Sequence, residues 1–275
     1  MGSIFVSEKA CAPLRQALEE TGHTVYTVKS SDVVYDAISS HPDIYMCRIK
    51  NVLVIDDAVN TVPDIRAQYM EELEEKADDF SEAPIIPVLQ PDDTRGHIVF
   101  EMGGIGYEYP FDIVYNAAVT DRFFIHNTEW TSPSLLDRAR NAGLDIIPVK
   151  QGYTKCSCVL AGKRGLITAD EGIFHTVSAY NEMVLEEQGK EKDELSDDTI
   201  DVLLIEKGHV ALDGFEYGFL GGASGCIENT VYFNGDLSKH PDFEKICRFI
   251  ESQNCRVRYF EGEPLADIGS VIYLP

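Results

Sequence analysis

Three aspartates recur in similar sequence surroundings and are the residues best suited to bind a ligand. They are Asp43 in HPDI, Asp112 in YPFDI and Asp267 in LADI. If their loops meet, the gathered carboxylates need a cation, a shared proton or backbone N–H donors. A guanidinium or ammonium group would supply the cation, since guanidinium pairs bidentately with carboxylate. The alternative is that each aspartate caps its own tight turn, as Asp commonly does.

An acid/base group and a nucleophile can be sought beside these aspartates. His41 is the best acid/base candidate because it stands two residues before Asp43, and a histidine near a carboxylate titrates around neutral pH. The alternative is that His41 has only a structural place in the turn before Pro42. Two cysteines are candidate nucleophiles. Cys226 follows a glycine-rich turn, where backbone can approach a ligand closely. Cys156 follows Lys155, whose charge would lower a thiol pKa.

Each candidate also has a structural interpretation. Free cysteines are commonly buried, so both thiols can simply pack in the core. In an extended segment, Lys155 would point away from Cys156. Asn116 stands four residues after Asp112 and is, with Lys155, a polar candidate for ligand binding.

The sequence predicts no metal and no cofactor. The run Cys-Ser-Cys over 156–158 lacks the second cluster that structural zinc sites use. The glycine-rich runs 103–106 and 221–225 match neither the dinucleotide fingerprint nor the Walker pattern.

The composition excludes several classes of function. The formal net charge of -24 opposes binding to nucleic acid and to anionic membranes. Residues 1–9 lack the basic and apolar regions of a signal peptide, and the chain has an odd number of cysteines, seven. We therefore expect a cytoplasmic protein with reduced thiols, whose partner is a small polar molecule. The oligomeric state does not follow from the sequence.

The elements that position these residues recur along the chain. The aspartate motif is followed by an apolar strand each time, and looser copies occur at 152–154 and 217–220. Three units clearly alternate strand, helix, strand and motif, which predicts α/β packing of helices on a sheet. Such a recurring unit is typical of closed repeat folds, in which equivalent loops converge. We expect helices near 7–21, 63–76, 133–142, 171–187 and 240–250, and strands near 23–28, 52–55, 123–125, 144–149, 166–167, 231–233, 255–260 and 271–273. We also expect an irregular loop at 83–95 and an exposed charged segment at 186–198.

Five units of this kind, with Asp and Gly in the turns before short strands, resemble the pentein fold of the guanidino-group-modifying enzymes. The runs VKQGYTKC (149–156), YGFLGGASG (217–225) and YFNGDLSKHP (232–241) resemble an uncharacterised clostridial-type family within that fold. The resemblance implies a five-bladed pentein-type α/β propeller, a single closed domain over residues 1–275 built from five strand–helix–strand repeats.

The resemblance also implies a chemistry from which this chain departs. Enzymes of the fold use a cysteine nucleophile, a histidine acid/base and carboxylates that hold the guanidinium. Their cysteine lies in the glycine-rich turn of the last unit, which here reads DIGS over 267–270. Ser270 is a far weaker nucleophile than a thiolate unless a base adjoins it.

Three hypotheses of function follow, and they leave open whether the protein is an enzyme. The leading one is a ring-axis pocket for a small cationic or polar, amino-acid-like ligand, held by Asp43, Asp112 and Asp267. The second is a cysteine-dependent hydrolase acting on C–N bonds, with Cys226 or Cys156 as nucleophile and His41 as acid/base. The third is a noncatalytic protein-interaction module.

Overall fold

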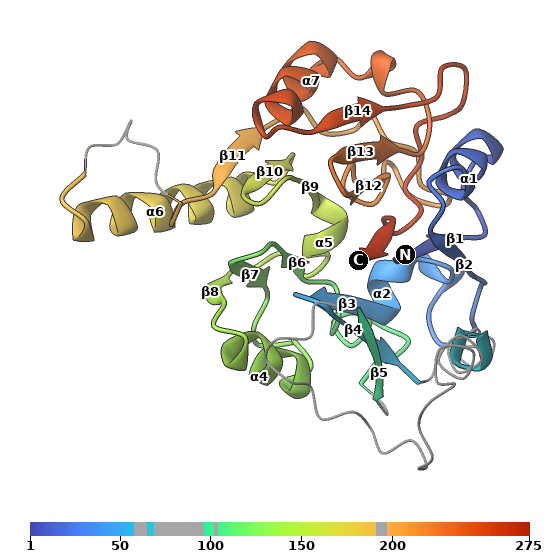
Figure 1. The fold of residues 1–275 in the computed structure, drawn as a ribbon, viewed down its shortest axis with the longest axis horizontal. Coiled ribbons are helices and arrows are strands. Elements are labelled where there is room, and N and C mark those ends of the chain that lie inside the picture. Colours follow the sequence, from blue (N-terminus) through green and yellow to red (C-terminus); the bar gives the residue numbers. More distant parts are fainter. Residues whose placement is uncertain (58–64, 69–95, 102–103, 191–196) are drawn as a thin grey trace.

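The computed structural model contains five small sheets of three strands each (Figure 1). It describes residues 1–57, 65–68, 96–101, 104–190 and 197–275. In every sheet the central strand pairs antiparallel with one neighbour and parallel with the other. This mixed α/β architecture of repeated small sheets confirms the fold class at that level.

The strands follow the chain in order, apart from the sheet that joins its two ends. That sheet is β15(Ile272–Leu274), β1(Ser3–Ser7) and β2(Thr24–Val28), with Ser3 opposite Leu274. The other four are β3(Met46–Ile49), β4(Val52–Asp56) and β5(His97–Glu101); β6(Ala118–Val119), β7(Phe123–His126) and β8(Asp145–Pro148); β9(Cys158–Ala161), β10(Gly165–Thr168) and β11(Asp201–Leu204); and β12(Ser224–Ile227), β13(Thr230–Phe233) and β14(Arg256–Arg258).

In four of the five sheets a longer helix connects the central strand to its parallel neighbour, because a parallel pair needs a crossover. These helices are α1(Ala12–Glu19), α4(Pro133–Asn141), α6(Glu171–Glu187) and α7(Phe243–Ser252). Most of the connection between β4 and β5 lies outside the described residues. Pro133 occupies the first turn of α4, and the Asp170 side chain caps α6 by accepting from the Ile173 N–H. On α7, Ile246 and Ile250 stand four residues apart and are both fully buried against the fifth sheet.

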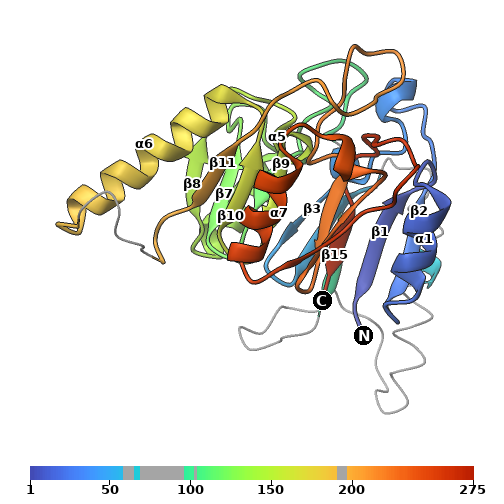
Figure 2. The same cartoon turned by 90° about the horizontal axis from the view of Figure 1, so that it is seen from above.

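The strand that pairs antiparallel with the central strand of each sheet lies toward the centre of the molecule (Figure 1). These inner strands are β3, β6, β9, β12 and β15. Contacts join β15 to β3, β3 to β6, β9 to β12 and β12 to β15. Two of them are preceded by short helices, α2(Pro42–Tyr45) before β3 and α5(Thr154–Ser157) before β9. The turns that enter the inner strands lie at the end opposite the chain termini (Figure 2).

Several local predictions need correction. The helix expected from position 7 begins at Ala12, because Ser7 still pairs with Val28 as the last residue of β1. The helix expected from position 240 begins at Phe243, after the short helix η2(Leu237–Lys239). The segment 154–157 is not extended: it forms the helical turn α5, with the Ser157 N–H donating to the Tyr153 carbonyl, and the extended strand β9 begins only at Cys158. Most of 63–76, all of 83–95 and part of 186–198 lie outside the described residues.

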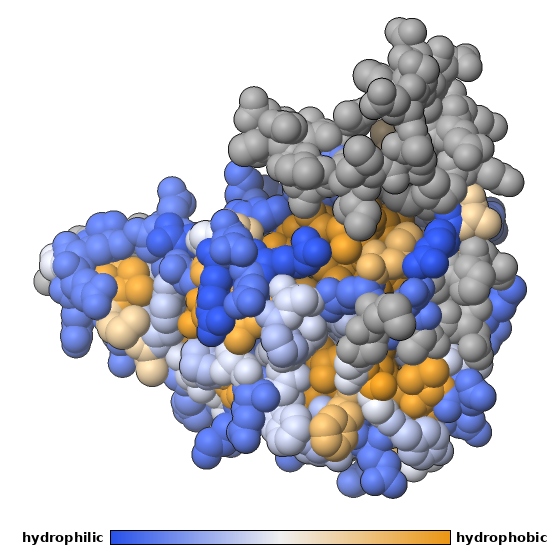
Figure 3. All heavy atoms as spheres, turned by 90° about the horizontal axis from the view of Figure 1, so that it is seen from below, coloured by the Kyte–Doolittle hydropathy of each residue, from blue (hydrophilic) through white to orange (hydrophobic). Residues whose placement is uncertain are grey.

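The surface and the thiols agree with the composition. Figure 3 shows a face on which hydrophilic residues surround smaller apolar areas. All seven cysteines are free thiols. Among the described residues, no helix has the length and apolar character needed to cross a membrane. The expectation of one domain over residues 1–275 stays a prediction.

His126, a buried histidine at the end of β7, makes the free energy of unfolding depend on pH. His126 on β7 has Nδ1 2.7 Å from the Thr131 hydroxyl and Nε2 3.0 Å from the Gly152 carbonyl oxygen. Burial lowers the pKa of His126 to about 4, against the opposing effect of the Gly152 hydrogen bond. As the pH falls from about 6.5 to about 4, this histidine becomes protonated in the unfolded chain but stays neutral in the folded chain. We expect a loss of about 3 kcal/mol in the free energy of unfolding from this group.

Urea unfolding at a series of pH values measures this effect. His126→Gln should reduce the slope of the free energy of unfolding against pH between about 4 and 6.5, and the part of the slope that comes from the other buried histidine, His41, should remain. His175→Gln, which changes a histidine on α6, serves as the control and should leave the slope unchanged. Equal slopes for His126→Gln and the original protein would contradict the prediction.

Candidate functional site

The turns that enter the five inner strands meet in one buried group of residues. Each sheet contributes one of them, and we call this group the central cluster: Asp43, Asn116, Cys156, Gly221 and Ser270. The central cluster is therefore the place at which the recurring turns of the sequence meet. Loops that are far apart in the sequence converge on one place.

Asp43 is the hub of the central cluster and is fully buried. Its Oδ2 accepts from the Ser270 hydroxyl at 2.7 Å and from the Cys156 thiol at 3.0 Å. Its backbone N–H donates to the Gly269 carbonyl at 3.1 Å. Burial raises the pKa of Asp43, and the Lys155 charge and the hydrogen bonds from Cys156 and Ser270 oppose that rise.

Asn116 holds the cluster together through both ends of its amide. The side-chain Oδ1 accepts from the backbone N–H groups of Lys155 at 2.8 Å and Cys156 at 3.2 Å. The Nδ2 donates to the Asp43 carbonyl at 3.0 Å and to the Cys156 sulfur at 3.3 Å. Predicted as a ligand-binding residue, Asn116 uses its hydrogen-bonding capacity within the protein.

Ser270 links the cluster to Lys155. The Lys155 ammonium donates to the Ser270 hydroxyl at 3.0 Å, and that hydroxyl also lies 3.0 Å from the Gly221 carbonyl. Ser270 has a φ of 66°, in the left-handed region that non-glycine residues seldom adopt. Its backbone N–H is held there by the Gly222 carbonyl at 2.7 Å.

His41 and Asp267 lie side by side next to the cluster, with His41 Nδ1 3.8 Å from Asp267 Oδ1. Burial lowers the pKa of His41 to about 3, so the imidazole is neutral and the pair is not an ion pair. Asp267 accepts from the backbone N–H groups of Phe219 at 2.9 Å and Gly269 at 3.0 Å. Burial, followed by the charge of Asp43, raises the pKa of Asp267 to about 7.

Asp112 belongs to a different hydrogen-bond network. Its Oδ2 accepts from the Tyr153 hydroxyl at 2.7 Å, and that hydroxyl lies 3.0 Å from the Tyr35 hydroxyl. Burial raises the pKa of Asp112. Of the three motif aspartates, Asp43 and Asp267 therefore adjoin His41, and Asp112 contacts the tyrosine pair.

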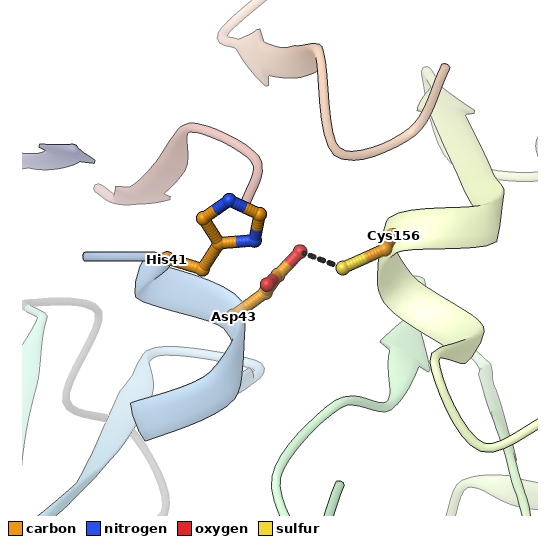
Figure 4. A group of neighbouring side chains, drawn as sticks. All are labelled: His41, Asp43 and Cys156. Atoms are coloured by element: carbon orange, nitrogen blue, oxygen red, sulfur yellow. Dashed lines mark hydrogen bonds between the residues drawn. The ribbon is translucent and has the colours of Figure 1, made fainter. Parts of the chain in front are cut away.

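The structure separates the two candidate nucleophiles. His41, Asp43 and Cys156 point toward one another, and one donor atom of each lies within 4.8 Å of the other two (Figure 4). Cys226 lies on β12, where its sulfur is 3.4 Å from the Glu228 carbonyl. Burial and then Asp43 raise the pKa of Cys156 well above its usual value, and burial and then Cys255 raise the pKa of Cys226 to about 11. Both thiols are therefore protonated near neutral pH, whereas the thiolate is the nucleophile.

A cavity of about 320 Å³ lies between the five inner strands, each of which contributes to its lining. Its charged lining residues are Arg48, Lys155, Lys163, Asp121 and Glu228. The three motif aspartates are not among the described residues that line it. Lys155 is common to the cavity and to the edge of the central cluster.

Arg48 is the residue of this cavity that sequence reasoning missed. It stands in β3, with the sequence MCRI, between buried apolar residues. A charged residue inside an otherwise apolar strand was the available signal. One guanidinium nitrogen, Nη1, donates to the Tyr273 carbonyl at 2.7 Å. Burial lowers the pKa of Arg48, and Asp121 is the foremost charge that opposes this.

Comparison with known proteins gives a family and two distant structures. A family model described as "Family of unknown function (DUF6873)" matches residues 93–272. No curated protein matches the chain. An arginine dihydrolase from the ornithine-ammonia cycle in cyanobacteria, ArgZ, is similar over 96% of this chain, with 11% identity and a TM-score of 0.48, and this chain covers 37% of its length. SxtG, an amidinotransferase from the Microseira wollei saxitoxin pathway, is similar over 94% of this chain and 88% of its own, with 10% identity and a TM-score of 0.42.

Proposed function

We propose that this chain, which belongs to the DUF6873 family of unknown function, binds a small amino-acid-like molecule in the cavity between its inner strands. The proposal includes the five-bladed pentein-type arrangement expected from the sequence. The repeated topology of the five sheets and the contacts between inner strands support that arrangement.

The observation that carries the proposal is the guanidinium of Arg48 in the cavity wall. Among the described residues its hydrogen-bond partner is the neutral carbonyl of Tyr273, and none of their carboxylates lies within ion-pair distance of it. Arg48 is half-buried, and a cation that loses part of its hydration without gaining a paired anion is destabilising. In a chain of net charge -24, a lining in which three cationic side chains face two carboxylates is also unusual. A ligand carboxylate would pair with Arg48 in the bidentate geometry that guanidinium favours.

The rest of the lining suits the other parts of an amino acid. The Lys155 ammonium adds a second positive charge, and Asp121 and Glu228 offer carboxylates to an ammonium or guanidinium group. Apolar side chains such as Leu160 and Ile272 lie between these charges. The volume of about 320 Å³ is within the range of small-molecule sites. These residues favour a ligand that carries an anionic group, so a purely cationic ligand fits the cavity less well than a zwitterion.

Thermal unfolding in the presence of matched ligands tests this proposal. Arginine and agmatine form a pair that differs by the carboxylate. We expect amino acids to raise the unfolding temperature and agmatine to do so much less. Arg48→Met should weaken the binding of the stabilising amino acid by at least about tenfold, since a charge-assisted bidentate pair is lost. Arg48→Lys, which keeps the charge, should be affected less.

The control is Arg140→Met, which removes an exposed arginine of α4 whose partner is Asp137. It should bind as the original protein does. Three results would overturn the proposal: equal stabilisation by agmatine and arginine, undiminished binding by Arg48→Met, or no stabilisation by any of the twenty amino acids at millimolar concentration.

The alternatives expected from the sequence have less support. A cysteine-dependent hydrolase is favoured by the proximity of Cys156 to His41 and Asp43, but the protonated thiol opposes it. An interaction module is favoured by exposed aromatic side chains, namely Tyr107, Tyr109, Phe111 and Phe215. The predicted binding role of Asp43, Asp112 and Asp267 also stays a prediction.

A further inference from the structure

We infer that His41, Asp43 and Cys156 form a binding site for a zinc ion. The three residues offer a nitrogen, an oxygen and a sulfur atom, all within 4.8 Å of one another. They come from two short helices that face each other, α2 and α5 (Figure 4). None of the three residues lines the cavity, although Lys155 adjoins both sites.

Two of the three side chains have buried polar atoms without a hydrogen-bond partner among the described residues, which indicates a missing ligand. His41 is 1% exposed, and neither ring nitrogen has a hydrogen-bond partner in the described part of the chain. The same holds for Oδ1 of Asp43, which is fully buried. Buried polar atoms are nearly always satisfied, because leaving them unpaired costs free energy. A metal ion bound between them would satisfy the imidazole and the carboxylate together.

The donor set indicates which metal fits. Mixed nitrogen, oxygen and thiolate donors are typical of zinc, which takes them at about 2.0–2.3 Å in a tetrahedron. Donors in such a tetrahedron lie about 3.5 Å apart. Movements of about an ångström would therefore bring the present donors into place. The fourth position is left for water, as in zinc sites with three protein ligands.

The surroundings already supply the outer hydrogen bonds that metal ligands need. Asn116 donates to the Cys156 sulfur at 3.3 Å, and Ser270 donates to Asp43 Oδ2 at 2.7 Å. Asp267 lies beside the His41 ring, with its Oδ1 3.8 Å from Nδ1. The position of His41 is set by Gly269, where a Cβ atom would come within 2.1 Å of the His41 Cβ.

The charges of the site balance when zinc is bound. Coordination breaks the S–H bond of Cys156, and the proton leaves to solvent while the sulfur electron pair binds the ion. The thiolate of Cys156 and the carboxylate of Asp43 then carry two negative charges, which balance the two positive charges of the ion.

Metal analysis of the untagged full chain tests this site. The protein is refolded from urea with zinc, so that the buried site can fill, and is then dialysed and measured by mass spectrometry for metal content. We expect about one zinc per chain. Cys156→Ser and His41→Gln should each lower the retained zinc at least about tenfold. Cys158→Ser, which removes a buried thiol outside the group, should retain it.

Cobalt gives a second readout that needs no variant to fold. Refolding with Co²⁺ should produce the near-ultraviolet charge-transfer band of a cobalt–thiolate bond. The inference is overturned if the folded original protein, verified by circular dichroism, retains less than about a tenth of an equivalent of zinc. Absence of the cobalt band, or zinc retention by Cys156→Ser and His41→Gln equal to that of the original protein, would overturn it as well.

Discussion

Gly221→Ala is expected to destabilise the protein by about 3 kcal/mol or more, which is the cost of forcing extra volume into a packed interior. A Cβ atom at this position would lie 2.4 Å from the Cys156 carbonyl oxygen and 2.5 Å from both N and O of Cys158. All three are backbone atoms, so no side-chain rotation relieves the contact. The turn before β12 would have to separate from α5 and β9, which breaks the hydrogen bond from Gly222 N–H to the Cys156 carbonyl at 2.8 Å.

Urea unfolding followed by circular dichroism measures this loss. Gly104→Ala is the matched control, because the described residue nearest to its added Cβ is Val114, whose side chain lies 3.6 Å away in an ordinary contact. It should change the free energy of unfolding by less than about 0.5 kcal/mol. If Gly221→Ala unfolds at the same urea concentration as Gly104→Ala, the prediction that the turn at Gly221 packs directly on the backbone of Cys156 and Cys158 is wrong.

Asn116→Ala is the second large effect, with an expected loss of about 3 kcal/mol in the free energy of unfolding. The substitution removes the acceptor of the Cys156 N–H and the donor to the Asp43 carbonyl, at 3.2 and 3.0 Å. Because Asn116 is fully buried, the groups that lose it as a partner are not hydrated by solvent instead, and leaving them unpaired costs free energy. The α2 and α5 turns would also lose the side chain that connects them.

The comparison variant is Asn127→Ala. Its side chain donates to the Lys150 carbonyl at 3.1 Å at an exposed position, so we expect a loss of at most about 1 kcal/mol. Equal losses for the two variants, measured by the same urea unfolding, would show that Asn116 does not clamp the cluster. A normal stability of Asn116→Ala together with altered ligand binding would restore its predicted binding role.

The repeated units were predictable because their causes are local. Apolar strands separated by amphipathic helices and by turns with Asp and Gly follow from periodicity and turn chemistry. The helix over 171–187 agrees with α6 at both ends, since Asp170 is a strong N-cap. The predicted helix starts were wrong at Ala12 and Phe243. Before Ala12 the chain is held in β1 by pairing with β2, and before Phe243 it forms the short helix η2, which the Asp236 side chain caps.

The sequence by itself also determined that the turns with Asp43 and Asp267 matter, since recurrence marks equivalent places in a repeat. Only the tertiary structure decided what stands beside them. Cys156 lies 3.0 Å from Asp43 although 113 residues separate the two in the chain, and Cys226 lies in the wall of the cavity instead. Spacing along a chain carries no information about such contacts, because they depend on how five sheets pack against one another. The unpaired imidazole of His41 and the cationic wall at Arg48 arise from that packing alone.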